Sequence, residues 1–460
     1  MTETYDAIVI GAGQAGGPLS TALARAGHRT ALVEADQVGG TCINYGCTPS
    51  KTMVASARVA YLGRRAPEYG VRTGSIGVDM PAVRQRKRDV VRSFRQSSQS
   101  RIESTPGLNL IFGEARFVGQ KRLEVSLRDG GQSELSADLI VINAGARPAP
   151  APFPLNGVQP LDSTSVMELD RVPERLVVLG GSYVGLEFAQ MFVRLGSQVS
   201  VVELAPRLAP SEDPDVSEAV AEIMREDGIE VLLDTRARSA SRVDGGIELN
   251  VQSADSDRVL SGTELLLAAG RVPNTDRLRP EAAGIETDQR GFVVVNDRLE
   301  ASLPGVYAVG DVTGEPAFTH ISYDDYRILR ANLLEGGSLS RAGRLVPYTM
   351  FIDPQLGRVG MTEQEARQAG RRVRVARMPM AWVARALEVA EPRGFMKAVV
   401  DANTDRILGC AVLGIEGGEL MSMIEIAMMG KLPYTALRDA VFAHPLLAES
   451  LNNLFVNFDD

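Results

Sequence analysis

The chain has 460 residues, of which 44% are hydrophobic and 23% charged, and its formal net charge at pH 7 is −9. This length suffices for roughly two to four domains with their own cores, and the composition excludes a fibrous or disordered protein. The acidic balance argues against a general nucleic-acid or membrane-surface role, and no apolar run approaches the ~20 residues of a membrane helix. The N-terminal sequence enters a strand pattern without a basic leader or cleavage site, so we expect a cytoplasmic protein.

The first motif lies at the N-terminus. An apolar strand at 7–10 leads into a GxGxxG turn, a helix, a second strand at 30–33 and then Glu34. GxGxxG alone is a weak signal, but this full context is typical of a dinucleotide-binding βαβ unit. The glycines let backbone N–H groups approach a pyrophosphate at a helix N-terminus, and Glu34 can accept hydrogen bonds from a ribose. The glycines of this turn are Gly11, Gly13 and Gly16.

The next feature is the stretch GGTCINYGCTPSK, which contains two of the three cysteines of the chain, Cys42 and Cys47. So few cysteines exclude a disulfide-scaffold fold, and a close pair in a reducing compartment is more often catalytic or metal-binding than structural. No second CxxC and only three histidines accompany the pair, which disfavours a zinc site. A metal site and a structural staple stay open as alternatives to a redox role.

The spacing of the pair limits how the two sulfurs could meet. Five positions on a regular helix place two residues roughly 140° apart around the axis. The cysteines can therefore bridge only if Cys42 lies in the loop that enters a helix and Cys47 in the first turn of that helix. A thiol at a helix N-terminus has its thiolate favoured by the helix dipole. Lys51, one helical turn further on, is in the simplest interpretation a solvent-facing lysine.

A second glycine motif follows in the middle of the chain. A strand at 176–179 leads into GGSYVG, a helix, a strand at 198–202 and then Glu203, so the chain is expected to hold two nucleotides. Ser182 stands where the middle glycine is usual. The Glu203 carboxylate can bond both hydroxyls of a ribose and would repel a 2′-phosphate, which favours NADH over NADPH, although Arg207 nearby weakens this preference.

Three other features are interpreted as structural. The basic run at 84–88, with Arg92 and Arg95, is expected to be the solvated face of a helix. Methionines crowd the last third of the chain, and helically spaced methionines such as those in MSMIEIAMMGKL are more often core or dimer packing than a copper site. Cys410, in the apolar strand pattern ILGCAVLG, is expected to be a buried small hydrophobe. We therefore expect no resident metal.

The two glycine units, GTCINYGCTPSK, GVYAVGDVTG at 305–314 and HPLLAES at 444–450 together resemble the FAD-dependent pyridine nucleotide–disulfide oxidoreductases. The segments AFTHISYDDYRILRANLL, PYTMFIDPQLGRVGMTEQEA and HPLLAESLNNLF resemble most closely the mercuric-reductase-like branch, which includes the copper(II) reductase of bacterial reactive-chlorine resistance. The resemblance implies an α/β, glutathione-reductase-like fold with two Rossmann-like dinucleotide-binding domains and a C-terminal α+β dimerisation domain.

This family organisation implies domain boundaries. The joins are marked by the run from Asn143 to Pro148 with APAPFP, and by the run from Ala269 to Asn274. The expected segments are 1–150 (FAD-binding, first part), 151–270 (NAD(P)-binding), 271–340 (FAD-binding, second part) and 341–460 (C-terminal interface).

The resemblance also implies two cofactors, FAD in the first unit and NADH, with NADPH possible, in the second. Asp311 would bond the flavin ribityl chain, and Tyr183 would cover the nicotinamide pocket. The residues expected to bind FAD are Gly11, Gly13, Gly16, Glu34, Gly40, Thr41, Lys51, Gly145, Gly310 and Asp311. Those expected to bind the nicotinamide nucleotide are Gly180, Gly181, Ser182, Tyr183, Gly185, Glu203 and Gly270.

The catalytic roles carried by the resemblance are as follows. Cys47 would face the flavin and Cys42 would exchange with substrate. Lys51 would point at the flavin N5 and pair with Glu187. His444, oriented by Glu449, would act as acid and base toward the interchange thiol, and this dyad would come from the other subunit of a homodimer. We also expect the His444–Pro445 bond to be cis, and the segment from Phe442 to Glu449 to open an apolar helix that ends in Leu451 and Leu454.

Several substrates could accept the electrons of this enzyme. Mercuric reductase carries a second cysteine pair near its C-terminus and commonly an N-terminal metal-binding domain, and this sequence has neither. Our leading hypothesis is a flavoenzyme that passes electrons from NADH to a metal ion such as Cu(II) or Hg(II), or to an oxidised thiol, in oxidant or metal defence. The alternatives are a disulfide reductase of the dihydrolipoamide dehydrogenase or glutathione reductase type, and an FAD- and NADH-binding redox sensor without turnover. No nucleic-acid or membrane partner is expected.

Overall fold

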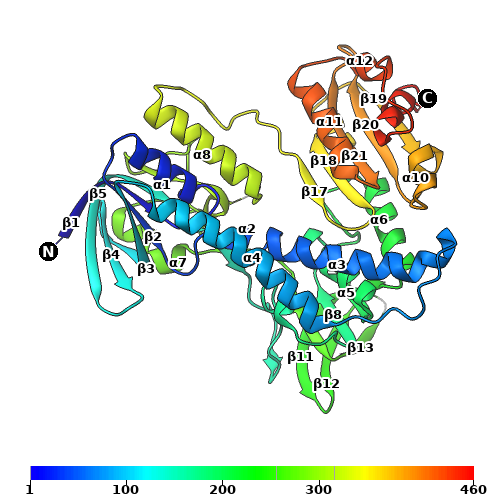
Figure 1. Cartoon of the computed structure of the whole chain (residues 1–460), viewed down its shortest axis with the longest axis horizontal. Helices are drawn as coiled ribbons and strands as arrows, with labels where there is room; N and C mark the ends of the chain where they lie inside the picture. The colour runs from blue at the N-terminus through cyan, green and yellow to red at the C-terminus, as the bar shows by residue number, and fades with distance from the viewer. Residues whose placement is uncertain (1, 255, 315, 460) are drawn as a thin grey trace. The chain divides into compact units, whose positions relative to one another are not determined.

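The computed structural model describes residues 2–254, 256–314 and 316–459, and the contacts within it divide the chain into two units, both drawn in Figure 1. Unit 1 comprises Met1–Thr52, Ala82–Ala149 and Gly270–Arg344, and unit 2 comprises Met53–Pro81, Pro150–Ala269 and Leu345–Asp460. Each unit is thus assembled from three separate stretches of sequence. None of the described helices is long and apolar enough to cross a membrane.

Unit 1 is built on the buried strand that the sequence predicts at 7–10. Its strands are β1 (Thr2–Ile10), β2 (Thr30–Glu34), β3 (Leu108–Gly119), β4 (Arg122–Leu127), β5 (Gln132–Ile142) and β16 (Val306–Ala308). The parallel order is β3-β2-β1-β5-β16, and β4 pairs antiparallel with both β3 and β5. Ala7 and Val9 face one core cluster and Ile8 and Ile10 the other, as the two-residue period of a strand requires.

The helices of unit 1 follow from the ends of these strands. They are α1 (Gly16–Arg25), α2 (Gly40–Asn44), α4 (Met80–Glu103), α7 (Thr275–Leu278) and α8 (Thr319–Leu334), with 3-10 turns at Pro280–Ala283 and Gly310–Thr313 and a strand pair, β6 (Ala146–Pro148) with β15 (Arg271–Pro273). Helix α3 (Cys47–Arg65) begins in unit 1 and continues into unit 2. Gly11 turns the chain from β1 towards α1 with φ of 101°, and a Cβ there would lie 2.2 Å from the carbonyl oxygen of Asn143. Only glycine fits this turn.

Unit 2 contains the second nucleotide-type sheet. Its parallel strands, in the order β10-β9-β8-β14, are β8 (Arg175–Leu179), β9 (Gln198–Val202), β10 (Glu230–Leu232) and β14 (Glu264–Leu267). Helices α5 (Tyr183–Leu195) and α6 (Pro214–Glu226) accompany them, and a further sheet is formed by β7 (Leu155–Asn156), β11 (Arg236–Val243), β12 (Gly246–Gln252) and β13 (Asp257–Gly262). The strands predicted at 176–179 and 198–202 are therefore confirmed.

The C-terminal part of unit 2 is an antiparallel sheet covered by a helix. The strand order is β17 (Tyr348–Met350), β18 (Gln355–Gly360), β21 (Ile407–Gly414), β20 (Phe395–Asp401) and β19 (Val373–Pro379). Helix α11 (Gly417–Met429) packs on β18 and β21 through Met421 and Ile424. The remaining helices are α9 (Glu363–Gln368), α10 (Ala384–Glu388), α12 (Tyr434–Arg438) and α13 (Ser450–Leu454), with 3-10 turns at Ala66–Tyr69, Ser165–Glu168, Met380–Trp382 and Leu447–Glu449.

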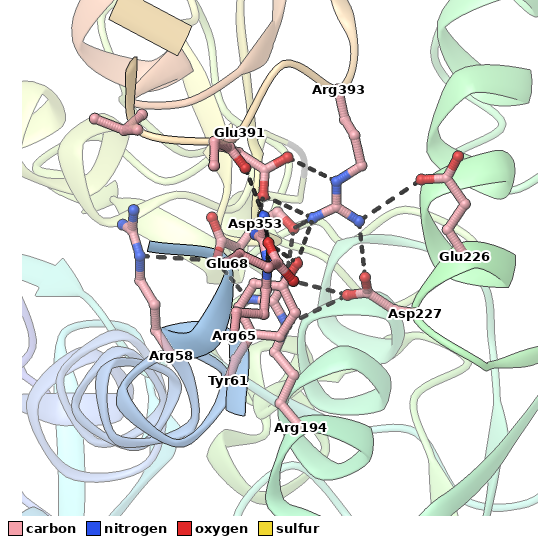
Figure 2. Close-up of polar contacts among 12 residues, drawn as sticks. Arg58, Tyr61, Arg65, Glu68, Arg194, Glu226, Asp227, Asp353, Glu391 and Arg393 are labelled. Carbon is pink, nitrogen blue, oxygen red and sulfur yellow. Dashed lines mark hydrogen bonds and ion pairs between the residues drawn. The ribbon is translucent and has the colours of Figure 1, made fainter. Parts of the chain in front are cut away.

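An ion-pair network fixes the second half of α3 within unit 2 (Figure 2). The guanidinium of Arg194, on α5, lies 3.8 Å from the ring centre of Tyr61 on α3 and bonds the carboxylates of Asp227 and Asp353. Arg393 continues the network, with Nη1 2.8 Å from Asp227 and its guanidinium also paired with Glu391. The network borders a cavity of about 460 Å³. Because Arg194 and Asp227 are each 5% exposed, their charges depend on these partners.

A second buried cluster joins α6 to the C-terminal sheet. Lys397, on β20, is 2% exposed, and its ammonium lies 2.9 to 3.1 Å from carboxylate oxygens of Asp213, Asp215 and Glu363. Asp213 also accepts hydrogen bonds from the backbone N–H groups that begin α9. The nucleotide-type sheet and the C-terminal sheet are therefore held together by paired charges as well as by apolar packing.

We predict that Arg194→Met lowers the midpoint of thermal unfolding by about 5–10 °C, because it removes the nearest cation from buried Asp353 and one of the two guanidinium groups that pair with buried Asp227, at a cost of roughly 3–5 kcal/mol. Arg225→Met is the matched control, since Arg225 lies on α6 in an exposed pair with Glu218 and exposed pairs contribute about 0–1 kcal/mol. Differential scanning calorimetry of both variants measures the difference. Equal midpoints for the two variants would refute the importance of the network.

Candidate active site

The first glycine turn is closed by the carboxylate that follows β2. Glu34 accepts hydrogen bonds from the backbone N–H of Ala12 and of Asp36, both at 2.7 Å. Its side chain is buried, and this burial raises the pKa of Glu34 although both backbone bonds oppose the shift. Gly16 donates its N–H to the Asn143 side chain at 2.9 Å. The turn thus holds Glu34 beside the N-terminus of α1, and each carboxylate oxygen keeps a lone pair for another donor.

The second glycine turn repeats this arrangement in unit 2. Glu203 accepts from the N–H of Gly181 at 2.6 Å and from the N–H of Ala205 at 2.7 Å. Ser182 is the N-cap of α5 in extended conformation, and Tyr183 is the first helical residue. A Cβ at Gly185 would lie 1.9 Å from the carbonyl oxygen of Gly180, so the last glycine is required by close packing. A serine in place of the middle glycine leaves the turn intact.

The cysteine pair lies where two helices of unequal length meet. Cys42 belongs to the short helix α2 rather than to a loop, which corrects the expectation from spacing, and Cys47 is the first residue of α3, as expected. Tyr45 and Gly46 are not helical and separate α2 from α3, so the two cysteines do not lie on one helical axis. Both cysteines are free thiols.

The two thiols interact with each other and with α8. A hydrogen bond with Cys47 is the main cause that raises the pKa of Cys42, and burial adds to it. The Cys47 sulfur also lies 3.3 Å from the hydroxyl of Thr319, the first residue of α8. The raised pKa of Cys42 favours the neutral form of its thiol in the reduced pair.

Thr319 was not assigned a role from the sequence. It lies 272 positions from Cys47, within the segment AFTHISYDDY that contributed only to the family resemblance. No local spacing connects a threonine at the start of α8 with a thiol at the start of α3. Only the fold of unit 1 brings them together.

Lys51 and Glu187 lie on different elements. Lys51 is half-buried on α3, one turn after Cys47. Glu187 is 5% exposed on α5 and accepts a hydrogen bond from the N–H of Phe351 at 2.8 Å. Their pairing stays a prediction.

The C-terminal pair is in hydrogen-bond contact. His444 Nδ1 lies 2.8 Å from a carboxylate oxygen of Glu449, so Nδ1 donates and Nε2 is left to exchange protons. The predicted cis bond between His444 and Pro445 is confirmed. The helix expected to follow this segment is present as α13 (Ser450–Leu454), preceded by a 3-10 turn at Leu447–Glu449. His444 is 73% exposed and can reach another molecule.

The remaining expected residues lie in turns beside the two sheets. Gly145 and Gly270 have φ of 67° and 121°, and Gly310 precedes Asp311 in the 3-10 turn after β16. Thr41 lies in α2 beside Gly40. Cys410 is fully buried in β21, as expected, and burial raises its pKa to about 12. Among the described residues, no group of three or more His, Cys, Asp and Glu side chains could hold a metal ion.

Comparison with known proteins assigns this arrangement. Residues 5–325 match the family described as "Pyridine nucleotide-disulphide oxidoreductase", and residues 346–455 match its dimerisation domain. The chain belongs to the pyridine nucleotide-disulphide oxidoreductase family. The fold class expected from the sequence, with two dinucleotide-binding units and a C-terminal dimerisation domain, is thereby confirmed.

Several members of the family resemble the chain over nearly its whole length. The probable pyridine nucleotide-disulfide oxidoreductase RclA of Escherichia coli is 38% identical, covering 98% of each chain, and the solved structure of its Cu(II) complex has a TM-score of 0.90 with 99% of each chain covered. Mercuric reductase of Staphylococcus aureus is 32% identical over 99% of this chain and 82% of its own. Dihydrolipoyl dehydrogenase of Haloferax volcanii is 34% identical over 96% and 94%.

Pyridine nucleotide-disulphide oxidoreductases bind FAD and NAD(P)H, and the first unit has the features that FAD requires. A Cβ at Gly40 would lie 2.8 Å from the Cα of Gly13, so the cysteine stretch packs directly on the glycine turn. The N–H groups that begin α1 suit a pyrophosphate and Glu34 suits a ribose. Asp311, with Arg271 at 3.8 Å, supplies a further charged group beside this sheet. The residues present therefore fit FAD.

We predict that Glu203→Arg shifts nucleotide preference from NADH towards NADPH by about tenfold or more, because a cation replaces the carboxylate that repels a 2′-phosphate. Isothermal titration of both nucleotides against both proteins gives the ratio of dissociation constants. Glu218→Arg, an exposed charge reversal on α6, is the control and leaves the ratio unchanged. An unchanged ratio in Glu203→Arg would show that this carboxylate does not contact the ribose.

Proposed function

We propose that the chain passes electron pairs from NADH, through FAD and the Cys42–Cys47 pair, to a metal ion such as Cu(II) or Hg(II) or to an oxidised thiol, in defence against oxidants or metals. The observation that carries the proposal is the contact of two free thiols, with Cys47 at the first turn of α3. Two thiols that interact directly are suitably arranged to form a disulfide.

Reduction of a metal ion is supported by the descriptions of similar proteins. RclA is described as an HOCl-induced flavoprotein disulfide reductase, and one of its solved structures is a Cu(II) complex. Several mercuric reductases are between 31% and 33% identical to the chain. Soft thiolate ligands suit Cu(I) and Hg(II), so a dithiol is a suitable contact group for such ions.

The chemistry of the chain's own residues balances as follows. FAD held by unit 1 would supply the relay of an electron pair from NADH to the disulfide of Cys42 and Cys47. Reduction of that disulfide takes up two electrons and two protons. Its re-formation releases them, and the electrons reduce two Cu(II) ions to Cu(I), or one disulfide to two thiols. Cys47 would face the flavin, and Cys42, whose raised pKa favours its protonated form, would meet the acceptor.

We place the proton-transfer group at His444. Its Nε2 would take the proton of Cys42 and return it to a leaving thiolate, while Glu449 holds the ring through Nδ1. In this proposal the dyad serves the site of a second subunit, with segment 341–460 forming the interface of a homodimer. FAD belongs to segments 1–150 and 271–340, and the nucleotide, preferably NADH, to segment 151–270.

A second candidate function is reduction of a small or protein disulfide. It is favoured by the His444–Glu449 contact, because a leaving thiolate needs a proton whereas a reduced metal ion does not. The similarity to dihydrolipoyl dehydrogenases is consistent with it. A redox sensor without turnover is the third candidate, and steady-state NADH consumption with any natural acceptor would rule it out.

We predict that Cys47→Ser abolishes NADH-dependent reduction of Cu(II) and of disulfides, because the disulfide that accepts the electrons cannot form. Anaerobic assays with a Cu(I)-specific chromophore and with lipoamide or glutathione disulfide measure both reactions. Cys410→Ser is the matched control, since Cys410 is buried in β21 of unit 2, whereas the pair belongs to unit 1. Normal turnover in Cys47→Ser would refute the dithiol route.

We further predict that His444→Ala lowers disulfide turnover by at least about 10²-fold, the usual contribution of a general acid, and lowers Cu(II) reduction much less. The two rates are measured on the same preparation. Equal losses of rate with both acceptors would refute the acid–base role proposed for His444. A larger loss with disulfides than with Cu(II) would support this role.

A further inference from the structure

The side chain between the two cysteines is more buried than its polarity suggests. Asn44, in the sequence Cys42-Ile-Asn44-Tyr-Gly-Cys47, is 7% exposed. Its Nδ2 donates to the carbonyl oxygens of Gly40 at 3.0 Å and Val38 at 3.1 Å, with a weaker contact to Gln37 at 3.4 Å. A buried amide with all its hydrogen bonds made is rigid, and a change that removes them leaves backbone carbonyls unsatisfied.

The other end of the Asn44 amide is held by a helix distant in sequence. Arg95, on α4, donates Nε to Asn44 Oδ1 at 2.7 Å. The sequence assigned Arg95 and the run 84–88 to the solvated face of a basic helix, and this is wrong for Arg95, which is half-buried, and for Lys87, which is 3% exposed. An arginine that donates to the amide oxygen fixes which end of the amide faces the carbonyls. Asn44 is therefore clamped from both sides.

The bonds of Asn44 act on the backbone that carries Cys42. Gly39 and Gly40 both have positive φ, at 103° and 59°, and Gly40 packs against the first glycine turn. Asn44 bonds the carbonyl of Gly40 four residues earlier and so closes helix α2, in which Cys42 lies midway. Tyr45, the next residue, donates its hydroxyl to Asp36 and secures the same loop at its start. Movement of Cys42 relative to Cys47 is limited by these bonds.

We propose that Asn44, held by Arg95, is a positioning residue that sets the equilibrium between the dithiol and the disulfide of Cys42 and Cys47. The inference rests on the proposed redox role of this pair. In the disulfide state the sulfur–sulfur bond itself restrains the loop, whereas in the dithiol state the restraint comes from Asn44. Loss of the clamp frees the dithiol more than the disulfide, so closing the disulfide costs more conformational entropy.

The test is a redox titration of the FAD-loaded protein without nucleotide. In glutathione buffers the dithiol and one glutathione disulfide give the protein disulfide and two glutathione thiols, so electrons and protons balance. Samples are acid-quenched and alkylated, and mass spectrometry of the peptide with Cys42 and Cys47 gives the fraction oxidised. Asn44→Ala and Arg95→Met are each expected to lower the equilibrium constant for disulfide formation by about tenfold, equal to about 30 mV towards positive potential.

Two comparisons separate positioning from a general loss of stability. Arg92→Met is the matched control on the same helix, because Arg92 is 59% exposed and pairs only weakly, at 3.4 Å, with exposed Asp89. It leaves the equilibrium constant unchanged. The double variant Asn44→Ala/Arg95→Met shifts the constant no further than the larger single change, since both act through one bond.

Constants within twofold of the wild type in Arg95→Met would overturn the inference, and so would additive effects in the double variant. If Asn44→Ala does not fold, Arg95→Met decides alone, because Arg95 is only half-buried. Failure of the wild-type protein to form any Cys42–Cys47 disulfide would instead refute the proposed function, so the two failures are distinguishable.

Discussion

The contact between the sulfurs of Cys42 and Cys47 is the constraint on which the rest of the site depends. The side chains of two residues five positions apart cannot meet on one regular helix, so the helix must be interrupted between them. The interruption lies at Tyr45 and Gly46, which end the short helix α2 and allow α3 to start at Cys47. The side chains of Asn44 and Tyr45 hydrogen-bond to residues that precede this interruption, and Ile43, between Cys42 and Asn44, is buried.

The two glycine turns, one in each unit, are stabilised by the same kind of hydrogen bonding. Each places a carboxylate, Glu34 or Glu203, at the end of the strand that follows the first helix of the unit. Each carboxylate accepts two backbone N–H groups, one from the turn and one from its own loop. The turn is thereby tied to the neighbouring strand before any nucleotide binds. Because the turn is already ordered, nucleotide binding loses less free energy to ordering of the protein.

Unit 2 contains buried cations whose role is structural. Lys397 and Arg194 are almost fully buried, and each is surrounded by carboxylates from several segments of unit 2. Such groups define which segments pack together, because a mispaired segment would bury an uncompensated charge. Of the two thiols, by contrast, Cys47 is the first residue of α3 and Cys42 lies midway along the short helix α2.

Much of this arrangement could be predicted from the sequence, and the exceptions have physical causes. Local patterns were sufficient for the strands at 176–179 and 198–202, the two glycine turns and buried Cys410, whereas the cis bond at His444 was expected from the family resemblance. The helical position of Cys42 could not be predicted, because one turn of helix has no periodicity to detect. Thr319 and Arg95 could not be predicted either, since each reaches the cysteine stretch only through the folded core of unit 1.

The measurement that tests the central claim most directly is an anaerobic rapid-quench count of thiols in a single turnover. The FAD-loaded protein is mixed with one equivalent of NADH, then with Cu(II) or a disulfide, and quenched with an alkylating reagent at each stage. The account predicts that Cys42 and Cys47 both become alkylated after NADH and lose this reactivity as the acceptor is reduced. Reduction of the acceptor with both thiols still present throughout would contradict it.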